Sequence, residues 1–135
     1  MAVFTDAEEV YDLIGGVFGA LAADPDRARL ARIGVVAQFR LTDPAAQITV
    51  PMNGDGLIEF GHASQQPDVV LRLSADLLHA LFLGTANATV AMARGQIRTE
   101  GPVAKVLSLV SLVRVVVPAY RERLEAAGRG DLLAA

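Results

Sequence analysis

Side chains that could carry chemistry are few in this sequence of 135 residues, which contains two histidines and no cysteine. His79 follows Asp76 by three residues, a spacing at which any two side chains on a helix are neighbours. Together with His62, this pair supplies the candidate groups for an enzyme that acts on an apolar substrate. A catalytic histidine needs an orienting carboxylate or a nucleophile within reach, and helical spacing alone is a weak sign of one. We expect both histidines to be non-catalytic.

The remaining charged side chains show no pattern of a metal or cofactor site. Glu8 and Asp12, and likewise Glu122 and Glu125, are spaced as solvated helix faces, with no histidine nearby to complete a metal site. Because cysteine is absent, disulfides, thiolate metal sites and a cysteine nucleophile are excluded. The sequence contains no Walker motif or dinucleotide-binding glycine motif. We expect no catalytic residues, no metal and no cofactor. A net charge of −3 also argues against a nucleic-acid partner.

The composition is unusually apolar for a chain of this length. Hydrophobic residues make up 53% of the sequence, above the roughly 45–50% of average domains. The excess apolar surface must lie in a subunit interface, against a membrane or around an internal cavity. Lys105 and Arg114 interrupt the most apolar stretch, Val103 to Val117, which is too short to span a bilayer. The acidic N-terminus does not resemble a secretory signal. We therefore expect a cytoplasmic protein with at most transient membrane contact.

Helical patterns lie at both ends of the chain. Thr5-Asp6-Ala7-Glu8 fits a capping box, and apolar residues then recur at helical spacing, which predicts a helix over 5–23. Glycines inside this helix favour close packing. Ser74 and Gly84 mark the start and end of a second helix, and Asn87 caps a short third one. Residues 103–113 are apolar nearly all round, which predicts burial on most sides. Pro118 is expected to break or kink the chain before a charged last helix over 119–127.

Five segments in the centre alternate between apolar and polar residues with the period of a β-strand, and they cover 34–41, 47–52, 57–61, 68–73 and 96–99. The turn signals Asp43-Pro44 and Asn53-Gly54-Asp55-Gly56 join the first three segments into a meander. The pattern predicts one domain over 1–135, a two-layer α+β fold. It comprises a five-stranded, largely antiparallel sheet with helices on one face and solvent on the other.

The order of these elements resembles the sterol carrier protein 2 family of lipid-transfer proteins. The resemblance rests on DVVLRLSADLLHALFL (68–83) and NATVAMARGQIRTEGPVAKVLSL (87–109), in which a strand, a Leu-rich helix, a short helix, a strand and an apolar helix follow one another. Gly95 and Gly101 frame the family's G-x-(I/L)-x-x-x-G strand. The similarity covers 31–112, and a C-terminal helical tail over 113–128 follows it.

The resemblance implies an apolar tunnel between sheet and helices that holds a sterol, fatty acid or acyl-CoA ester, with no catalytic centre. The expected wall residues from the strands are Phe39, Ile48, Val50, Ile58, Phe60 and Leu71. Those from the helices are Leu78, Phe82, Val90, Met92, Leu107 and Val110. Lys105 and Ser108 are candidates for binding a polar head group. Two alternatives stay open. One is an interaction module or homodimer that uses the apolar surface around Val113 to Val117, and the other is the enzyme described above.

Overall fold

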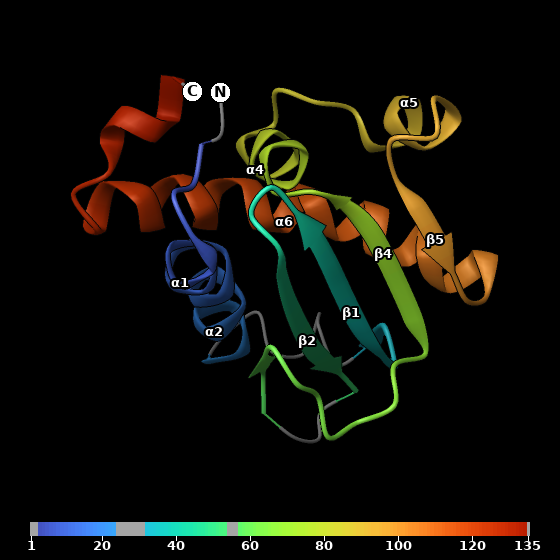
Figure 1. Ribbon diagram of the computed structural model, residues 1–135. Coiled ribbons are helices and arrows are strands. Elements are labelled where there is room, and N and C mark those ends of the chain that lie inside the picture. The colour runs from blue at the N-terminus through green and yellow to red at the C-terminus, as the bar shows by residue number, and fades with distance from the viewer. Residues whose placement is uncertain (1–2, 24–31, 54–56, 135) are drawn as a thin grey trace.

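The computed structural model describes residues 3–23, 32–53 and 57–134, which share one hydrophobic core. Figure 1 shows a sheet with the long helix α6 running across it and with α1 and α2 beside it. The elements are α1 (Ala7–Val10), the π-helical turn η1 (Tyr11–Gly15), α2 (Gly16–Ala23), β1 (Val35–Thr42), β2 (Ala46–Met52), β3 (Glu59–Phe60), β4 (Val69–Ser74), α4 (Ala75–Leu83), α5 (Ala88–Ala93), β5 (Arg98–Glu100), α6 (Val103–Ala126) and the 3-10 helix η2 (Gly130–Ala134).

The predicted five-stranded sheet is confirmed, with the strand order β3-β2-β1-β4-β5. Strands β1, β2 and β3 form the expected antiparallel meander, whereas β1 and β4 are parallel, so the sheet is mixed. The two edge strands differ from their predicted ranges. The predicted strand 57–61 is shorter and contains only Glu59–Phe60, and the predicted strand 96–99 is shifted to Arg98–Glu100. Residues 54–56 of the predicted turn after Asn53 lie outside the described residues.

The outer face of the sheet is less solvated than the alternation predicts. Gln38 and Thr49 point away from the helical layer, yet their exposed fractions are only 2% and 1%. The Gln38 amide nitrogen donates a hydrogen bond of 3.1 Å to the Thr49 hydroxyl, which satisfies both buried groups. The loop 61–68 and its neighbours border a hollow over this part of the sheet.

The N-cap of the N-terminal helix lies one residue later than predicted. Oδ1 of Asp6 accepts a hydrogen bond of 2.9 Å from the Glu9 amide, so Asp6, not Thr5, is the N-cap. The expectation that glycines allow close packing is confirmed at two positions. A Cβ on Gly15 would lie 2.5 Å from the Phe60 ring, and one on Gly16 would lie 2.8 Å from the Arg123 side chain.

The ends of α4 and α5 match their sequence signals. The Ser74 hydroxyl accepts a hydrogen bond from the Leu77 amide, and the Asn87 side chain accepts one from the Val90 amide. Gly84 ends α4 with a φ of 83°, in the left-handed region that a glycine C-cap occupies at least cost. These predictions are therefore confirmed.

The expected break at Pro118 is wrong, because α6 runs without interruption through this residue. The buried residues of the helix form one stripe on both sides of the proline: Val106, Leu109, Leu112, Val116, Tyr120 and Leu124. Pro118 has no amide hydrogen, so the carbonyl of Arg114 loses its helical hydrogen-bond partner. Both residues are exposed. Water can therefore bind that carbonyl, and burial of the stripe offsets the lost hydrogen bond.

The predicted burial of 103–113 on most sides is also wrong. Val103 and Leu107 are 74% and 53% exposed, and Ser108 and Ser111 are exposed as well. By length and composition alone α6 could cross a membrane, but core helices of soluble proteins meet the same criterion. In this structure it packs against α2 and α4 instead.

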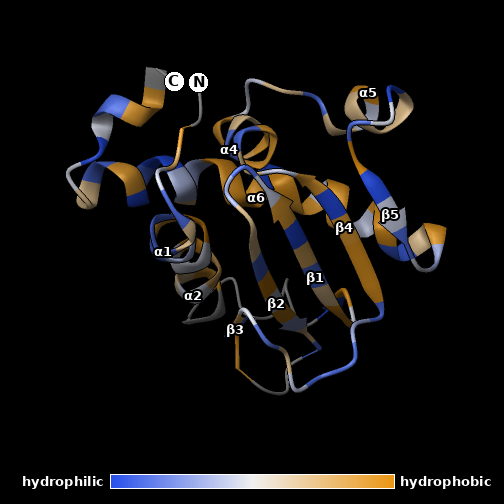
Figure 2. Cartoon of the chain, viewed as in Figure 1, coloured by the Kyte–Doolittle hydropathy of each residue, from blue (hydrophilic) through white to orange (hydrophobic). Residues whose placement is uncertain are grey.

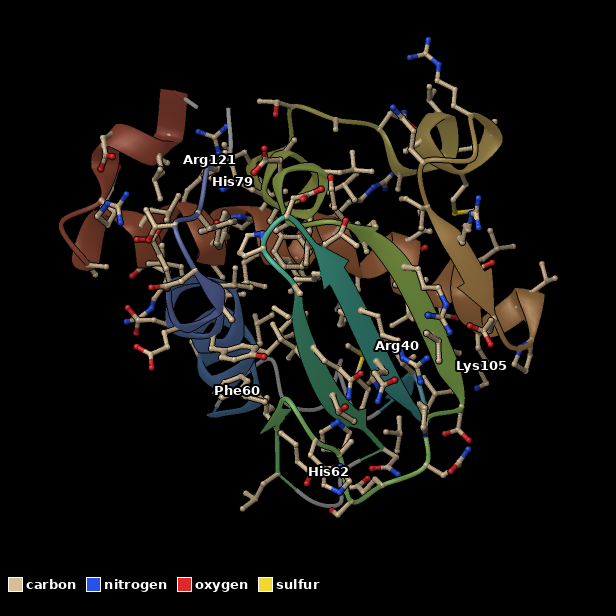
Figure 3. All side chains as sticks on the ribbon, in the orientation of Figure 1. Arg40, Phe60, His62, His79, Lys105 and Arg121 are labelled. Carbon is tan, nitrogen blue, oxygen red and sulfur yellow. The ribbon has the colours of Figure 1, made fainter. Side chains whose placement is uncertain are left out.

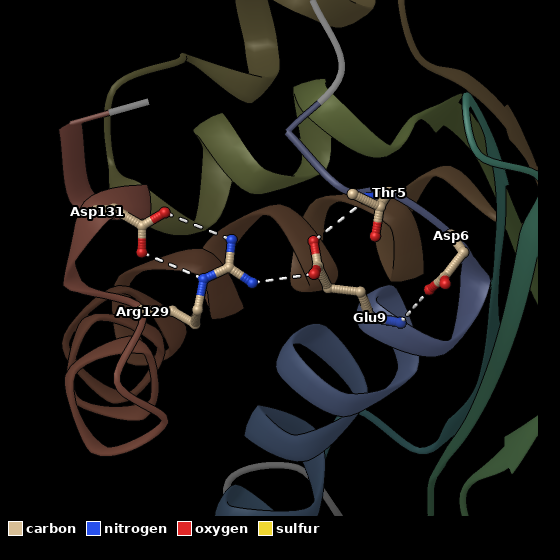
Figure 4. A network of polar contacts seen from close by, with 5 residues as sticks. All are labelled: Thr5, Asp6, Glu9, Arg129 and Asp131. Atoms are coloured by element: carbon tan, nitrogen blue, oxygen red, sulfur yellow. Dashed lines mark hydrogen bonds and ion pairs between the residues drawn. The ribbon is translucent and has the colours of Figure 1, made fainter.

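The two ends of the described chain meet in a network of ion pairs (Figure 4). Arg129, which follows α6, contacts Glu9 of α1 at 2.9 Å and Asp131 of η2 at 3.2 Å. The same Glu9 carboxylate accepts a hydrogen bond of 3.3 Å from the Thr5 amide. Exposed ion pairs contribute little to stability, about 0–1 kcal/mol each. The network therefore mainly fixes the position of the C-terminal segment.

Candidate functional site

An apolar cavity of about 50 Å³ lies between the inner face of the sheet and the helices. Figure 2 shows the hydrophobic colouring of the elements that surround it, including α4 and much of β1, β4 and α6. Within the described part of the chain, all the residues that line it are apolar. The lining residues are Phe18, Phe39, Leu71, Leu73, Leu78, Leu81, Phe82, Ala88, Met92, Ile97, Val106, Leu109, Val110, Leu112, Val113 and Val116.

Aromatic rings from four elements contact one another, in tilted and edge-to-face geometry, on one side of the cavity. The Phe18 ring of α2 lies 5.3 Å from Phe39 of β1 and 5.7 Å from Phe82 of α4, measured between centroids. Phe82 in turn makes an edge contact at 5.7 Å with Tyr120 of α6. Such pairs contribute about 0.5–1.5 kcal/mol each beyond the area they bury. They tie α2, β1, α4 and α6 together beside the cavity.

The cavity reaches the surface beside α5. Among its lining residues, Ala88 and Met92 of α5, Leu71 of β4, and Val110 and Val113 of α6 are partly exposed. Helix α5 is only six residues long and has one buried residue, Ala91. It is therefore the least anchored part of the wall.

Six of the twelve predicted wall residues line this cavity, namely Phe39, Leu71, Leu78, Phe82, Met92 and Val110. The other six lie elsewhere. Ile48 and Val50 are fully buried in the core of β2, and Ile58 packs against that core from the sheet edge. Phe60 is 47% exposed and stacks on Tyr11 at 4.9 Å, while Val90 and Leu107 are exposed. Ligand contact by any of the twelve remains a prediction.

Sequence reasoning missed ten lining residues. Most of them share a strand or helix face with a predicted one, as Leu73 does with Leu71, so the same periodicity could have found them. Phe18 carries no such signal, because only the tertiary fold brings the N-terminal helix beside β1 and α4.

The two residues proposed for a polar head group do not line the cavity. Nζ of Lys105 donates a hydrogen bond of 2.9 Å to the carbonyl of Ile33. The Ser108 hydroxyl donates one of 3.0 Å to the carbonyl of Ala104, within its own helix. Both groups therefore have partners within the protein, and Figure 3 shows Lys105 near the start of α6.

The histidines lie far apart in the structure (Figure 3). His79 is 1% exposed, and its ring nitrogens are 2.7 Å from the Tyr120 hydroxyl and 3.0 Å from the Leu132 carbonyl. Asp76 accepts a hydrogen bond of 2.8 Å from the Val3 amide, so its carboxylate helps hold the N-terminal segment. Burial lowers the pKa of His79, which favours the neutral ring. His62 is exposed on a loop. No three His, Asp or Glu side chains of the described residues gather as metal ligands.

This fold and this cavity define a class of small α+β proteins in which a sheet and a helical layer enclose an apolar site. A family model described as the SCP-2 sterol transfer family matches residues 18–114, more than half of the chain. The chain belongs to this family, as the order of its elements indicates. No curated protein sequence matches it significantly.

Solved structures of sterol carrier proteins share the fold. The sterol carrier protein domain 2 of Helicoverpa armigera is similar with a TM-score of 0.69 at 16% identity, over 87% of this chain and 95% of that one. Sterol Carrier Protein 2 from Yarrowia lipolytica, in its apo form, has a TM-score of 0.63 at 19% identity, over 90% and 96%. Palmitated SCP2L2 from Aedes aegypti has a TM-score of 0.58 at 20% identity, over 77% and 93%.

Proposed function

We propose that the protein is a non-catalytic carrier that binds a sterol, a fatty acid or an acyl-CoA ester in the apolar cavity. The observation that carries this proposal is the lining itself, which consists of apolar side chains alone. Transfer of an acyl chain from water into such a site is favourable by about 0.8 kcal/mol per CH₂ group. Selection by apolar contact gives broad specificity, because none of the described lining residues offers a polar side chain that would fix one ligand. Membership of the SCP-2 family and the likeness to a palmitated relative support the same function.

The cavity must widen to accept such a ligand. Its volume of about 50 Å³ is well below the roughly 300–1,000 Å³ of typical small-molecule sites. Helix α5 is the element that we expect to move, because it borders the opening and buries a single residue. In this proposal the ligand enters between α5 and α6, where Met92 and Val110 line the cavity.

The first test is native mass spectrometry of freshly purified protein, followed by organic extraction and identification of bound molecules. We expect an acyl or sterol-like species at about one per chain. A clean apo mass, with no uptake of added fatty acid or sterol, would contradict the proposal.

Two matched variants locate the site. Val110→Trp places an indole into the cavity from α6, and we expect fatty-acid binding to be lost or strongly weakened. Leu107→Trp, three residues earlier on the same helix, adds the same group at a position 53% exposed and outside the cavity. It is expected to bind as the parent protein does. Equal effects of the two variants would argue against this cavity.

The exposed apolar side chains suggest how the carrier obtains its ligand. Val103 and Leu107 of α6 are 74% and 53% exposed, and Val90 of α5 is 44% exposed. We propose transient contact of this surface with a membrane, and function in the cytoplasm. The second candidate is a homodimer or another protein partner covering the same side chains. Light scattering over a range of concentrations separates the two, because a strict monomer would contradict the homodimer.

A further inference from the structure

Three arginines form a row across the outer face of the sheet. Arg40 of β1 pairs with Arg72 of β4, and Arg72 pairs with Arg98 of β5. Neighbouring strands lie about 4.8 Å apart, so the row extends over about 10 Å. Because side chains alternate along a strand and Phe39, Leu71 and Ile97 line the inner cavity, the adjacent arginines point to the opposite face.

This arrangement places like charges directly opposite one another, which is destabilising in a sheet. Only Arg72 has a counter-ion among the described residues, since Glu100 contacts it at 2.9 Å. Arg40 and Arg98 form no ion pair within that part of the chain. The row therefore carries three positive charges against one negative charge, on a protein whose net charge is −3. An anion bound across the row would relieve this repulsion.

Arg40 is held in place by a chain of buried polar groups. Its Nε donates a hydrogen bond of 2.6 Å to Oε1 of Gln38, and Nε2 of Gln38 donates one of 3.1 Å to the Thr49 hydroxyl. Gln38 and Thr49 are 2% and 1% exposed. This chain fixes the Nε edge of the guanidinium, and the Nη edge remains available for the paired oxygens of an anion. Arg40 is labelled in Figure 3.

A surface hollow of about 430 Å³ lies over the row. It is lined by all three arginines, by the polar residues Thr42, Ser74 and Gln96, and by Leu41, Leu73 and Gly95, with no carboxylate among the residues that the structure describes. The adjoining hollow on the same face shares Arg40 but is bordered by Asp68 and Glu100, which would repel an anion. An anion is therefore expected to bind in the hollow that the three arginines line and not in the adjoining one.

We propose that Arg40, Arg72 and Arg98 form a binding site for a phosphate-bearing ligand, with a diphosphate as the best match. Guanidinium groups bind phosphate oxygens in pairs, and a row about 10 Å long suits an anion with several oxygens and more than one charge. The site lies on the face of the sheet opposite the apolar cavity. It goes beyond the carrier function proposed above, and either proposal can fail without the other.

The test is a titration with inorganic pyrophosphate that is monitored by calorimetry and by NMR of the arginine Nε–H signals. We expect saturable binding that shifts the Arg40 and Arg98 signals. Arg98→Gln is expected to weaken binding by about tenfold or more, the loss that one charge-assisted contact brings. Arg114→Gln makes the same change of charge at an exposed position of α6 and is expected to leave the affinity unchanged. Arg40→Lys keeps the charge, removes the paired donors and should also weaken binding.

A second arm identifies the source of the phosphate. The same variants are mixed with vesicles of phosphatidylcholine, with and without phosphatidic acid. Arg98-dependent binding of pyrophosphate without vesicle binding indicates a soluble ligand, whereas Arg98-dependent binding to phosphatidic acid indicates a lipid head group. The proposal is overturned if neither probe binds, or if Arg114→Gln weakens binding as much as Arg98→Gln does. Failure of the phosphate site would leave the carrier function untouched, because fatty-acid binding in the cavity is measured separately.

Discussion

The hydroxyl of Tyr120 donates a hydrogen bond of 2.7 Å to Nδ1 of His79, and both side chains are buried. The direction follows from the other ring nitrogen, which lies 3.0 Å from the carbonyl of Leu132. A carbonyl only accepts, so Nε2 carries the proton and Nδ1 of the neutral ring is the acceptor. The pair joins α4, α6 and η2 in one buried contact. His79, which its spacing from Asp76 made a candidate catalytic residue, thus holds these elements together.

This contact predicts that stability falls with acidity. Burial lowers the pKa of His79 below its ordinary value of about 6.5, so the unfolded chain takes up a proton before the folded one does. The free energy of unfolding is therefore fully retained above that value and decreases as pH falls below it, by at most about 1.4 kcal/mol per pH unit. Urea denaturation at several pH values from about 5 to about 8 measures the slope of the free energy of unfolding against pH. This range brackets the pKa of roughly 6.5 of free histidine.

The matched control is His62→Gln, since the chain contains only two histidines. His62 is exposed, and its replacement is expected to leave the slope as it is. If the slope disappears in this variant, His79 is not its source.

Removing the phenol hydroxyl tests the same contact in another way. Tyr120→Phe leaves Nδ1 of His79 buried without a donor, and we expect the free energy of unfolding to fall by about 1–3 kcal/mol. Tyr11→Phe is the control, because the Tyr11 hydroxyl accepts a longer bond of 3.3 Å from the Gln47 amide in a partly buried position. Chemical denaturation at neutral pH compares the two variants. An equal loss of unfolding free energy in both variants would show that the Tyr120–His79 hydrogen bond contributes no more to stability than the Tyr11 hydrogen bond does.

The cavity predicts the effect of enlarging one of its aromatic side chains. Phe82→Trp narrows the cavity from α4, and we expect fatty-acid affinity to fall by about tenfold or more while the fold persists. Phe60→Trp makes the same exchange beside Tyr11, outside the cavity. Displacement of a fluorescent fatty acid measures both. Unchanged affinity in Phe82→Trp would remove Phe82 from the site.

The continuous helix α6 predicts a stabilising substitution. Pro118→Ala restores the amide that can bond to the Arg114 carbonyl, and the free energy of unfolding should rise by about 1–3 kcal/mol. Pro102→Ala is the control, since Pro102 precedes the first helical residue and interrupts no helical bond. Thermal or urea denaturation of the pair decides the point. A loss of stability in Pro118→Ala would mean that the proline favours this helix geometry.

The sequence was most informative where one local signal is decisive. Ser74, Gly84 and Asn87 mark helix ends through their own side chains or backbone, and the alternation of β1 and β4 places Phe39 and Leu71 on the inner face. Local signals failed where tertiary burial outweighed them. A proline usually ends a helix, but the buried stripe on both sides of Pro118 keeps α6 intact.

The site was predictable to the extent that it follows strand and helix faces. Phe60 alternates correctly with Glu59, yet its short edge strand places it against Tyr11 instead of beside the cavity. Val90 and Leu107 are apolar without being buried, which periodicity cannot distinguish from a wall position. The arginine row depends on the pairing of β1 with β4 and of β4 with β5, a register that no single strand encodes.

The edge contact between Phe82 and Tyr120 gives the protein a built-in optical reporter. The chain has no tryptophan and only two tyrosines, so its near-ultraviolet signal comes from few rings. Tyr120 touches the Phe82 ring that lines the cavity, whereas Tyr11 stacks on Phe60 well away from the lining. Entry of a ligand that displaces Phe82 would alter the surroundings of Tyr120 alone. Tyrosine circular dichroism, with Tyr11→Phe to isolate one chromophore, could therefore follow loading of the protein without any added dye.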